Sequence, residues 1–364
     1  MWPVSERSNG GAGSVGGVRQ LVAGMTGPDP AVLDAARARL AGRTKPRDSL
    51  GLLEDVAVRY AAVRGAVRCG PVSACVVIAA ADHGVSAYGV SAYPAEVTGQ
   101  MISTVLRGGA ASAVLAASVG ARLAVVDCGT AAARVAEGVL DRRPASGPGG
   151  DLVLTDALRP GAAEELLDSG VRWAADRAAE GITLIGLGEL GIANTTPAAA
   201  LTSALLGLDA AAVCGPGTGL DAAGLRRKVD AVRAATARVG ARDVLGTLTG
   251  LGGAEIAFLA GVVLGAAAAR VPVLVDGVVT GAAALVAARL APAAPGSLLA
   301  AHLSPEPAHA QQLAALGLTP MLQLNMRLGE GTGALLAVPL VRAAVAVLTE
   351  MAGFADAGVT DTGA

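Results

Sequence analysis

Aromatic residues are scarce in this 364-residue sequence, which contains two Phe, three Tyr and two Trp. Proteins that bind single-stranded nucleic acid stack bases on aromatic side chains, so this composition argues against such a surface. An excess of charge of one sign is missing too, because 28 Lys and Arg residues stand against 30 Asp and Glu residues. The net charge of -2 gives no electrostatic reason to expect a nucleic acid as partner.

The sequence also lacks the usual marks of a membrane, secreted or metal-binding protein. The run from Ile256 to Ala269, in the most hydrophobic region, is shorter than the roughly 20 residues of a spanning helix. Glu6 and Arg7 stand near the start, and no apolar signal-peptide core follows them. The four cysteines have no CxxC pattern and no metal-ligand spacing, which favours buried free thiols. We therefore expect a cytoplasmic protein with no membrane segment and no bound metal.

Alternating strand and helix patterns are what the sequence has in quantity. The apolar run over 73–80 is typical of a strand buried on both faces of a parallel sheet. Similar runs recur, and helical spacing separates most of them. The predicted strands cover 73–80, 122–126, 182–185, 211–214, 271–275 and 298–302. This order predicts an α/β fold with a parallel, doubly wound, Rossmann-like sheet flanked by helices.

No linker of distinct composition divides the chain. Residues 1–30 are rich in Gly, Ser and Pro and lack periodicity, which predicts poor order. Residues 71–320 should form the large α/β domain. The helical patterns at 31–70 and 321–364 should form a small helical lobe built from the two chain ends.

Polar and glycine-rich segments follow five of the predicted strands. In a parallel sheet such segments meet at the carboxyl edge, where ligands bind. They are 82–85 with 91–94, 186–197, 215–219, 276–277 and 304–307. We expect the functional site at that edge.

Two of these segments suggest phosphate binding. Gly186-x-Gly188-x-x-Gly191 has the form of a dinucleotide fingerprint, but Thr196 as N-cap and Pro197 at the first helical position start the helix too late for NAD. The helix end would instead hold a single phosphate, or it is a capped helix without a ligand. The glycines at 215–219 would let backbone approach a ligand, and Lys228 could reach a phosphate unless residues 226–228 are only a solvated face.

Three carboxylates are candidates for proton abstraction: Glu189, Asp276 and Glu330. Glu330 stands between glycines just before a long apolar helix pattern, and this short window by itself is more typical of a surface turn. A carboxylate partly removed from water has a raised pKa and suits general-base work. His83, after the first strand, is either an acid/base group or a hydrogen-bonded structural residue.

Longer motifs connect these segments. The sequence resembles the nicotinate-nucleotide–dimethylbenzimidazole phosphoribosyltransferase family of cobalamin biosynthesis, from about Thr44 to Leu348. The motifs that carry the resemblance are 82–85, 89–101, 106–111, 186–197, 215–219 and 327–334. It implies a parallel α/β fold with a small lobe from both chain ends, a homodimer, and no metal or other cofactor. It also implies transfer of the phosphoribosyl group of nicotinate mononucleotide to 5,6-dimethylbenzimidazole, giving α-ribazole 5′-phosphate and nicotinate with inversion at C1′.

The resemblance also implies roles for single residues. Glu330 would be the general base that takes the benzimidazole N–H proton. The base pocket would contain Ser91, Tyr93, Gln100 and Met101. The residues implied for nicotinate mononucleotide are Gly188, Glu189, Gly191, Asn194, Thr195, Gly217, Lys228, Asp276, Ser304 and Gly329.

The sequence departs from the family pattern at a few positions. Asp48 and Ala193 stand where glycine is usual, Leu52 replaces an Arg, and Gln323 replaces a frequent acidic residue. None of these changes removes a proposed chemical group. The alternatives are transfer to another lower-ligand base, such as a purine or a phenol, and a nucleotide-binding protein that does no chemistry.

Overall fold

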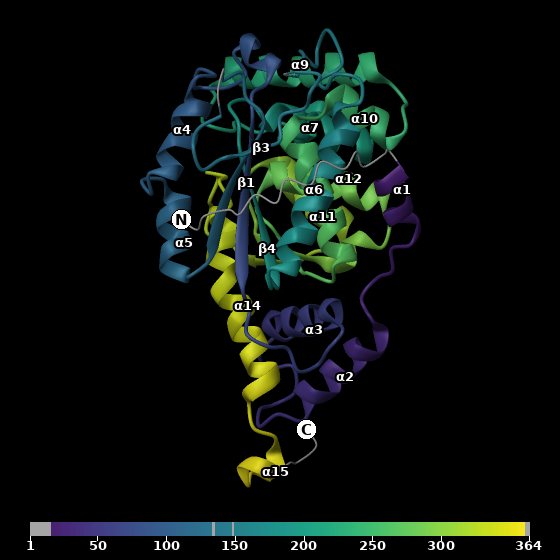
Figure 1. The fold of residues 1–364 in the computed structure, drawn as a ribbon, viewed down its shortest axis with the longest axis vertical. Helices are drawn as coiled ribbons and strands as arrows, with labels where there is room; N and C mark the ends of the chain where they lie inside the picture. Colours follow the sequence, from purple (N-terminus) through teal and green to yellow (C-terminus); the bar gives the residue numbers. More distant parts are fainter. Residues whose placement is uncertain (1–15, 133–134, 148, 361–364) are drawn as a thin grey trace.

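Seven parallel strands form the centre of the computed structural model, which describes residues 16–132, 135–147 and 149–360 (Figure 1). The strand order is β3-β2-β1-β4-β5-β6-β7. Their bounds are β1 Ala74–Ala81, β2 Arg122–Gly129, β3 Leu140–Asp141, β4 Leu184–Leu190, β5 Val273–Val275, β6 Leu298–His302 and β7 Pro320–Leu322. Strands β2 and β3 lie on one side of β1, and strands β4 to β7 follow on its other side. The strand order therefore reverses between β1 and β4. Ligands of open α/β sheets bind at such a switch point.

Helices cover both faces of the sheet. Every residue of β1 is buried, and its side chains alternate between two layers. Val77 and Ala79 belong to the core shared with α6 (Ala162–Ala179) and α11 (Ala254–Ala268). Val76 and Ile78 face the opposite layer, with α4 (Val97–Leu106), α5 (Ala111–Val119) and α14 (Thr332–Glu350). Each such Val or Ile contributes about 1.5–3 kcal/mol by burial, which explains the continuous apolar run.

Small residues replace aromatic ones in this core. Helices α6 and α11 cross so closely that a Cβ on Gly170 would lie 2.7 Å from the backbone nitrogen of Val262. Backbones that approach this closely leave little room for large rings between them. Helices that pack this closely suit a core made mainly of small residues.

The remaining helices complete the layers and the small lobe. They are α1 Gly16–Ala23, α2 Pro30–Ala41, α3 Leu52–Arg64, α7 Thr195–Leu206, α8 Ala210–Val213, α9 Ala222–Val239, α10 Val244–Leu251, α12 Val278–Leu290, α13 Pro307–Leu316 and α15 Phe354–Ala357, with short 3-10 helices η1 Gly84–Tyr88 and η2 Ala294–Ser297.

The small lobe joins the two ends of the chain. Figure 1 shows α2, α3 and the yellow end of α14 together at one end of the molecule. Arg39 lies on α2, and Arg43 follows the helix. Both side chains donate to the carbonyl of Leu348, at 2.8 Å each. These bonds satisfy carbonyls that the end of a helix leaves without partners. The predicted fold class, a parallel α/β sheet with a small helical lobe, is confirmed.

Some elements differ from the sequence prediction. The segment 211–214 is not a strand, because the Asp209 carboxylate caps a helical turn by accepting from Ala211 N over 2.8 Å, and alanines favour helix. Strands β3 and β7 were not predicted, since two or three residues carry no readable period. Part of the segment 1–30 is ordered: α1 packs Val18 and Leu21 on the core. Residues 1–15 lie outside the described part of the chain.

Two stretches pass a length and hydropathy test for membrane spans, Val97–Val119 and Thr332–Glu350. The first comprises two helices, α4 and α5, separated by a turn. The second is α14, which lies against the sheet and α3. Arg342 in its middle donates to backbone carbonyls, including that of Val72. Their apolar residues thus serve the packing of the α/β domain.

Candidate active site

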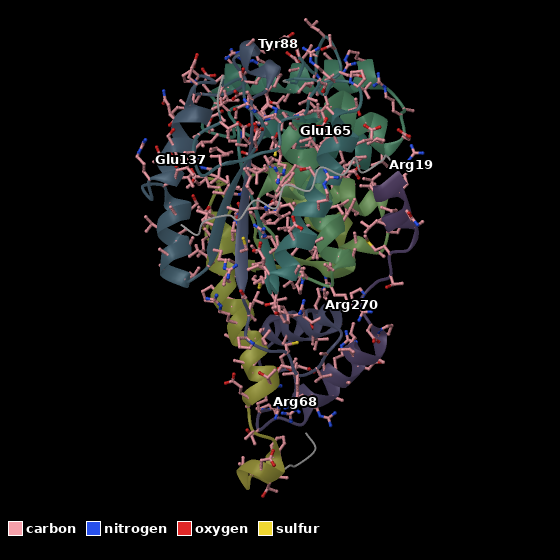
Figure 2. The ribbon with its side chains drawn as sticks, viewed as in Figure 1. Arg19, Arg68, Tyr88, Glu137, Glu165 and Arg270 are labelled. Carbon is pink, nitrogen blue, oxygen red and sulfur yellow. The ribbon has the colours of Figure 1, made fainter. Side chains whose placement is uncertain are left out.

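The loops that follow the strands gather at the end of the sheet away from the small lobe. Figure 2 shows Tyr88, which follows β1, at the top of the molecule, and Arg270, which precedes β5, close to the small lobe. The carboxyl ends of the parallel strands therefore point away from that lobe. Glycine-rich segments after β1 and β4 meet there at the switch point of the sheet.

The Glu330 loop has an unusual backbone. Gly329, Glu330 and Gly331 all have positive φ, at 86°, 57° and 69°. For the Glu this conformation costs roughly 1–2 kcal/mol. Glu330 is only 3% exposed, and its backbone N–H donates to the carbonyl of Glu189 over 3.1 Å. A surface turn is excluded by this burial, and the glycines are there because the chain turns left-handed for three residues.

Ser112 holds the Glu330 carboxylate. Its hydroxyl, at the start of α5, donates to Glu330 Oε2 over 2.9 Å, and the residue is fully buried. Ser112 was not among the predicted site residues. It directly follows the motif at 106–111, so its position beside that motif was the only signal available.

Glycines in β4 explain how the loop comes so close to the sheet. Gly188 lies inside the strand, and a Cβ there would be 2.7 Å from Gly331 N. Gly186 is also within β4, so the glycine pattern does not form the turn of a dinucleotide site. Helix α7 begins at Thr195, two residues earlier than predicted, with Asn194 rather than Thr196 in the N-cap position.

Glu189, the last but one residue of β4, is a second carboxylate beside this loop. The side-chain amide of Asn194 donates to its Oε2, so Asn194 binds Glu189 instead of capping α7. Desolvation raises the pKa of Glu189 to about 8; Asn194 opposes the shift, and Asp276 and Glu330 add to it. The residue is half-buried, which leaves it open to a ligand.

Asp276 follows β5 and is 1% exposed. Its Oδ1 accepts from Ala334 N over 2.9 Å, in the first turn of α14. His302, at the end of β6, lies with Nε2 3.6 Å from the same oxygen. Burial raises the pKa of Asp276 to about 7, while backbone N–H groups of α14 oppose the shift. Three neighbouring strands therefore place Glu189, Asp276 and His302 around the start of α14.

A buried ammonium forms the second part of the site. Lys228 on α9 is fully buried, and its Nζ donates to Thr195 Oγ1 over 2.8 Å and to the Gly215 carbonyl over 2.9 Å. Burial lowers the pKa of Lys228, and Glu306 counteracts that effect. The solvated-face interpretation is wrong for this residue. The structure brings Lys228 to the first residue of α7, where helix N–H groups favour an anion.

Glu306 connects this cluster with the end of β6. Its Oε1 accepts from Gly217 N over 2.7 Å, and its own N–H donates to Ser304 Oγ over 3.3 Å. Gly217 has a φ of 53°. Two predicted residues, Gly217 and Ser304, thus share hydrogen bonds with Glu306, which was not predicted, and the charge of Glu306 acts on Lys228.

The residues predicted for a base pocket are spread over one loop and one helix. The Ser91 hydroxyl lies 3.3 Å from Thr218 Oγ1, which joins the loop after β1 to the glycine loop at 215–219. Tyr93 is 54% exposed, and Gln100 on α4 is exposed. Met101 packs against the core beneath α4. For all four residues the base pocket remains a prediction.

The surroundings of His83 fit the structural interpretation. It is buried with Nε2 3.2 Å from Oε1 of Glu255, a fully buried residue at the start of α11. Burial acts to lower the pKa of His83, but Glu255 outweighs it and the net pKa is raised. Among the described residues, no group of three His, Cys, Asp or Glu side chains could hold a metal ion.

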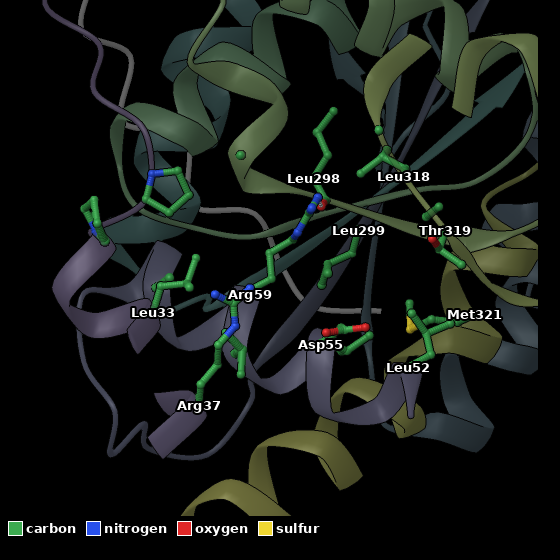
Figure 3. A pocket seen from close by; sticks show the side chains of 18 of the residues that line it. Leu33, Arg37, Leu52, Asp55, Arg59, Leu298, Leu299, Leu318, Thr319 and Met321 are labelled. Atoms are coloured by element: carbon green, nitrogen blue, oxygen red, sulfur yellow. Dashed lines mark hydrogen bonds between the residues drawn. The ribbon is translucent and has the colours of Figure 1, made fainter. Parts of the chain in front are cut away.

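A cavity of about 440 Å³ lies elsewhere, between α2, α3 and the amino ends of β6 and β7. Figure 3 shows Arg37, Arg59 and Asp55 at its edge and Leu299 and Met321 along its apolar wall. It contains none of the site residues described above. Its size alone does not make it the active site.

Comparison with known proteins shows the family of this chain. The sequence model of the phosphoribosyltransferase family matches residues 25–359. A protein of Chloroflexus aggregans is 47% identical over 335 residues, covering 92% of this chain and 95% of the relative. One of Roseiflexus castenholzii is 46% identical, covering 91% and 95%. Both are named nicotinate-nucleotide–dimethylbenzimidazole phosphoribosyltransferase.

A solved structure has the same fold. The crystal structure of nicotinate-nucleotide–dimethylbenzimidazole phosphoribosyltransferase from Thermus thermophilus is similar with a TM-score of 0.86 and 46% sequence identity, over 92% of this chain and 99% of that one. Fold, site and relatives define the class, and the protein is a phosphoribosyltransferase. Within that class the chain belongs to the nicotinate-nucleotide–dimethylbenzimidazole phosphoribosyltransferase family.

Proposed function

We propose that this enzyme transfers the phosphoribosyl group of nicotinate mononucleotide to 5,6-dimethylbenzimidazole, giving α-ribazole 5′-phosphate and nicotinate. The names of the relatives support these substrates. The observation that carries the proposal is the Glu330 carboxylate, buried at the switch point of the sheet and held by Ser112. A carboxylate in this position can accept the proton that the nucleophile must lose as it reacts.

Glu330 acts as the general base. One ring nitrogen of dimethylbenzimidazole attacks C1′ of the ribose while the C1′–nitrogen bond to nicotinate breaks. The proton on the other ring nitrogen passes to Glu330. General-base catalysis of this kind typically accelerates a reaction by about 10²–10⁴-fold. Glu189, with its pKa of about 8, stays mostly protonated at neutral pH, which limits the negative charge near the Glu330 loop.

The phosphate of the mononucleotide binds at the start of α7. Lys228 provides a fixed positive charge there, and the backbone from Thr195 onward provides N–H donors, with Gly217 beside them. Gly188, Glu189, Gly191 and Asn194 surround the phosphoribosyl group. The nicotinate ring faces Ser304 and Gly329, with Asp276 behind them. Holding both substrates in line supplies a further part of the rate acceleration.

The acceptor base lies beside the loop after β1. Ser91, Tyr93, Gln100 and Met101 line its pocket, and the exposed Tyr93 ring is free to cover a flat ligand. The active form is a homodimer in the cytoplasm. The second candidate function keeps the same transfer but accepts another lower-ligand base, since the exposed Tyr93 and Gln100 do not by themselves define a pocket size.

The proposal is tested by nicotinate release. Purified enzyme is incubated with nicotinate mononucleotide and, in turn, dimethylbenzimidazole, adenine and a phenol, and nicotinate is measured by chromatography. We expect the highest kcat/KM with dimethylbenzimidazole. A higher kcat/KM with adenine or the phenol would favour the second candidate. If no base releases nicotinate while the mononucleotide still raises the thermal stability, the protein binds the nucleotide without chemistry.

A further inference from the structure

Helix α14 starts directly after the Glu330 loop, and its N-cap position is Gly331, which has no side chain to offer. The first N–H groups of a helix need acceptors from outside the helix. In most helices the N-cap residue itself accepts from the second or third helical N–H. Here the acceptor must come from another part of the chain.

Asp276 supplies that acceptor from the end of β5. Its Oδ1 accepts from Ala334 N over 2.9 Å, and Ala334 is the third residue of α14. This is the bond that an N-cap aspartate would make, although the two residues are 58 positions apart. The carboxylate also neutralises the positive end of the helix dipole.

Asp276 and Gly333 lie so close that a side chain at Gly333 has no room. A Cβ at Gly333 would lie 2.7 Å from Asp276 Oδ1 and against the His302 ring. His302 Nε2 is 3.6 Å from the same oxygen, and both residues are buried. The start of α14 is thus packed against a carboxylate that has the His302 ring beside it.

The backbone of the strained loop is attached on both sides. On one side, Glu330 N donates to the carbonyl of Glu189 at the end of β4. On the other side, the loop continues into the helix turn that Asp276 caps, where Thr332 Oγ1 also donates to Gly329 O over 2.8 Å. A left-handed Glu persists only where its surroundings enforce the conformation.

We propose that Asp276 is a positioning residue, which caps α14 across the sheet and thereby holds Glu330 in its left-handed conformation. This inference rests on the proposed function, because it assigns Asp276 an effect on turnover through Glu330. It replaces the role in substrate binding that the sequence suggested for Asp276. Substrate affinity then depends on other residues.

The experiment compares Asp276→Ala in two backgrounds, the natural chain and the Glu330→Gln variant, with kcat and both KM values measured by nicotinate release. In the natural chain we expect kcat to fall tenfold or more, with KM values changed less than threefold. In the Glu330→Gln background the same substitution should lower kcat less than threefold, since no base remains to be positioned. Asp276→Asn keeps a carbonyl oxygen as acceptor and should retain kcat within about threefold.

A matched control separates this effect from loss of stability. Asp243 caps α10 by accepting from Gly246 N over 2.7 Å, in a helix outside the site. Asp243→Ala should lower the urea midpoint but leave kcat within twofold.

Several outcomes would overturn the inference. An unchanged kcat in Asp276→Ala would do so, as would an equal loss in both backgrounds. A raised KM with unchanged kcat would return Asp276 to substrate binding. If Asp276→Ala does not fold, the test uses folded Asp276→Asn, and a fall in its kcat of more than 30-fold would contradict the capping role. Full activity of Glu330→Gln alone would instead refute the general-base assignment.

Discussion

Ser112 and Glu330 are 218 positions apart in the chain, yet the Ser112 hydroxyl lies 2.9 Å from the Glu330 carboxylate. One residue comes from the start of α5 and the other from the loop before α14, and both are buried. A hydrogen bond to a charged group contributes about 1.5–3 kcal/mol, which is enough to select one orientation of a carboxylate. The proposed base is therefore aimed by a helix from the other half of the chain.

Ser112→Ala should lower kcat for nicotinate release by about tenfold, as expected for a lost hydrogen bond to a charged group. The KM for the mononucleotide should change little, because Ser112 contacts Glu330 and not the phosphate cluster. Ser118→Ala on the same helix is the control, since its hydroxyl only bonds Leu115 O and is exposed. Equal kcat values for the two variants would contradict the role of Ser112.

Glu330→Gln should reduce kcat by about 10²–10⁴-fold, the usual value of a general base. The amide has the same shape, so circular dichroism and the urea midpoint should stay close to those of the natural chain. Glu350→Gln, an exposed residue at the other end of α14, should keep full activity. Unchanged turnover in the Glu330 variant would remove the assignment.

Lys228→Met should raise the KM for nicotinate mononucleotide by about tenfold or more, because a buried point charge for the phosphate is lost. The KM for dimethylbenzimidazole should change less. Arg226→Gln, two positions away and exposed, is the control and should leave both constants unchanged. If both KM values rise together in Lys228→Met, the ammonium does not serve the phosphate specifically.

Ala193 has a φ of 74° at a position where the family usually has glycine. Ala193→Gly should therefore be neutral or stabilising by up to about 1 kcal/mol, since relief of the left-handed strain offsets the extra freedom of the unfolded chain. Ala198→Gly in α7 should destabilise by about 1 kcal/mol or more. Urea unfolding of both variants checks this contrast, and equal destabilisation would contradict it.

The pKa of about 8 for Glu189 predicts a pH dependence of stability. Between the ordinary glutamate value and pH 8, the folded chain keeps a proton that the unfolded chain has lost. The free energy of unfolding should therefore fall as the pH rises through this window. Glu189→Gln, which cannot ionise, should reduce that slope in urea midpoints measured from pH 5 to pH 9.

Part of the pH dependence of stability should remain in Glu189→Gln, because the pKa of Asp276 is also raised, to about 7. Glu180→Gln, an exposed glutamate at the end of α6, is the control for the substitution of a glutamate by glutamine. A natural chain whose stability rises between pH 5 and pH 8 would contradict the raised pKa values.

The sequence by itself determined the fold class and the family. Alternation of apolar strands and helices requires only local patterns, and the predicted parallel sheet is confirmed. The motifs around Gly188, Lys228 and Glu330 were readable because each is a compact run of unusual residues. Local patterns gave a wrong prediction at 211–214, where the Asp209 cap stabilises a helix instead of a strand. They also missed β3 and β7, which are too short to show a period.

Only the tertiary structure decided what surrounds the proposed base. Ser112, Asp276 and His302 come to the Glu330 loop from α5, β5 and β6, and no local pattern encodes such contacts. The structure also explains the family positions where this chain lacks glycine, since Asp48 and Ala193 both have positive φ. Strand order and helix packing place these groups, because hydrogen bonds and burial depend on neighbours in space rather than in sequence. Glu330 was found from its sequence, and its surroundings were found from the fold.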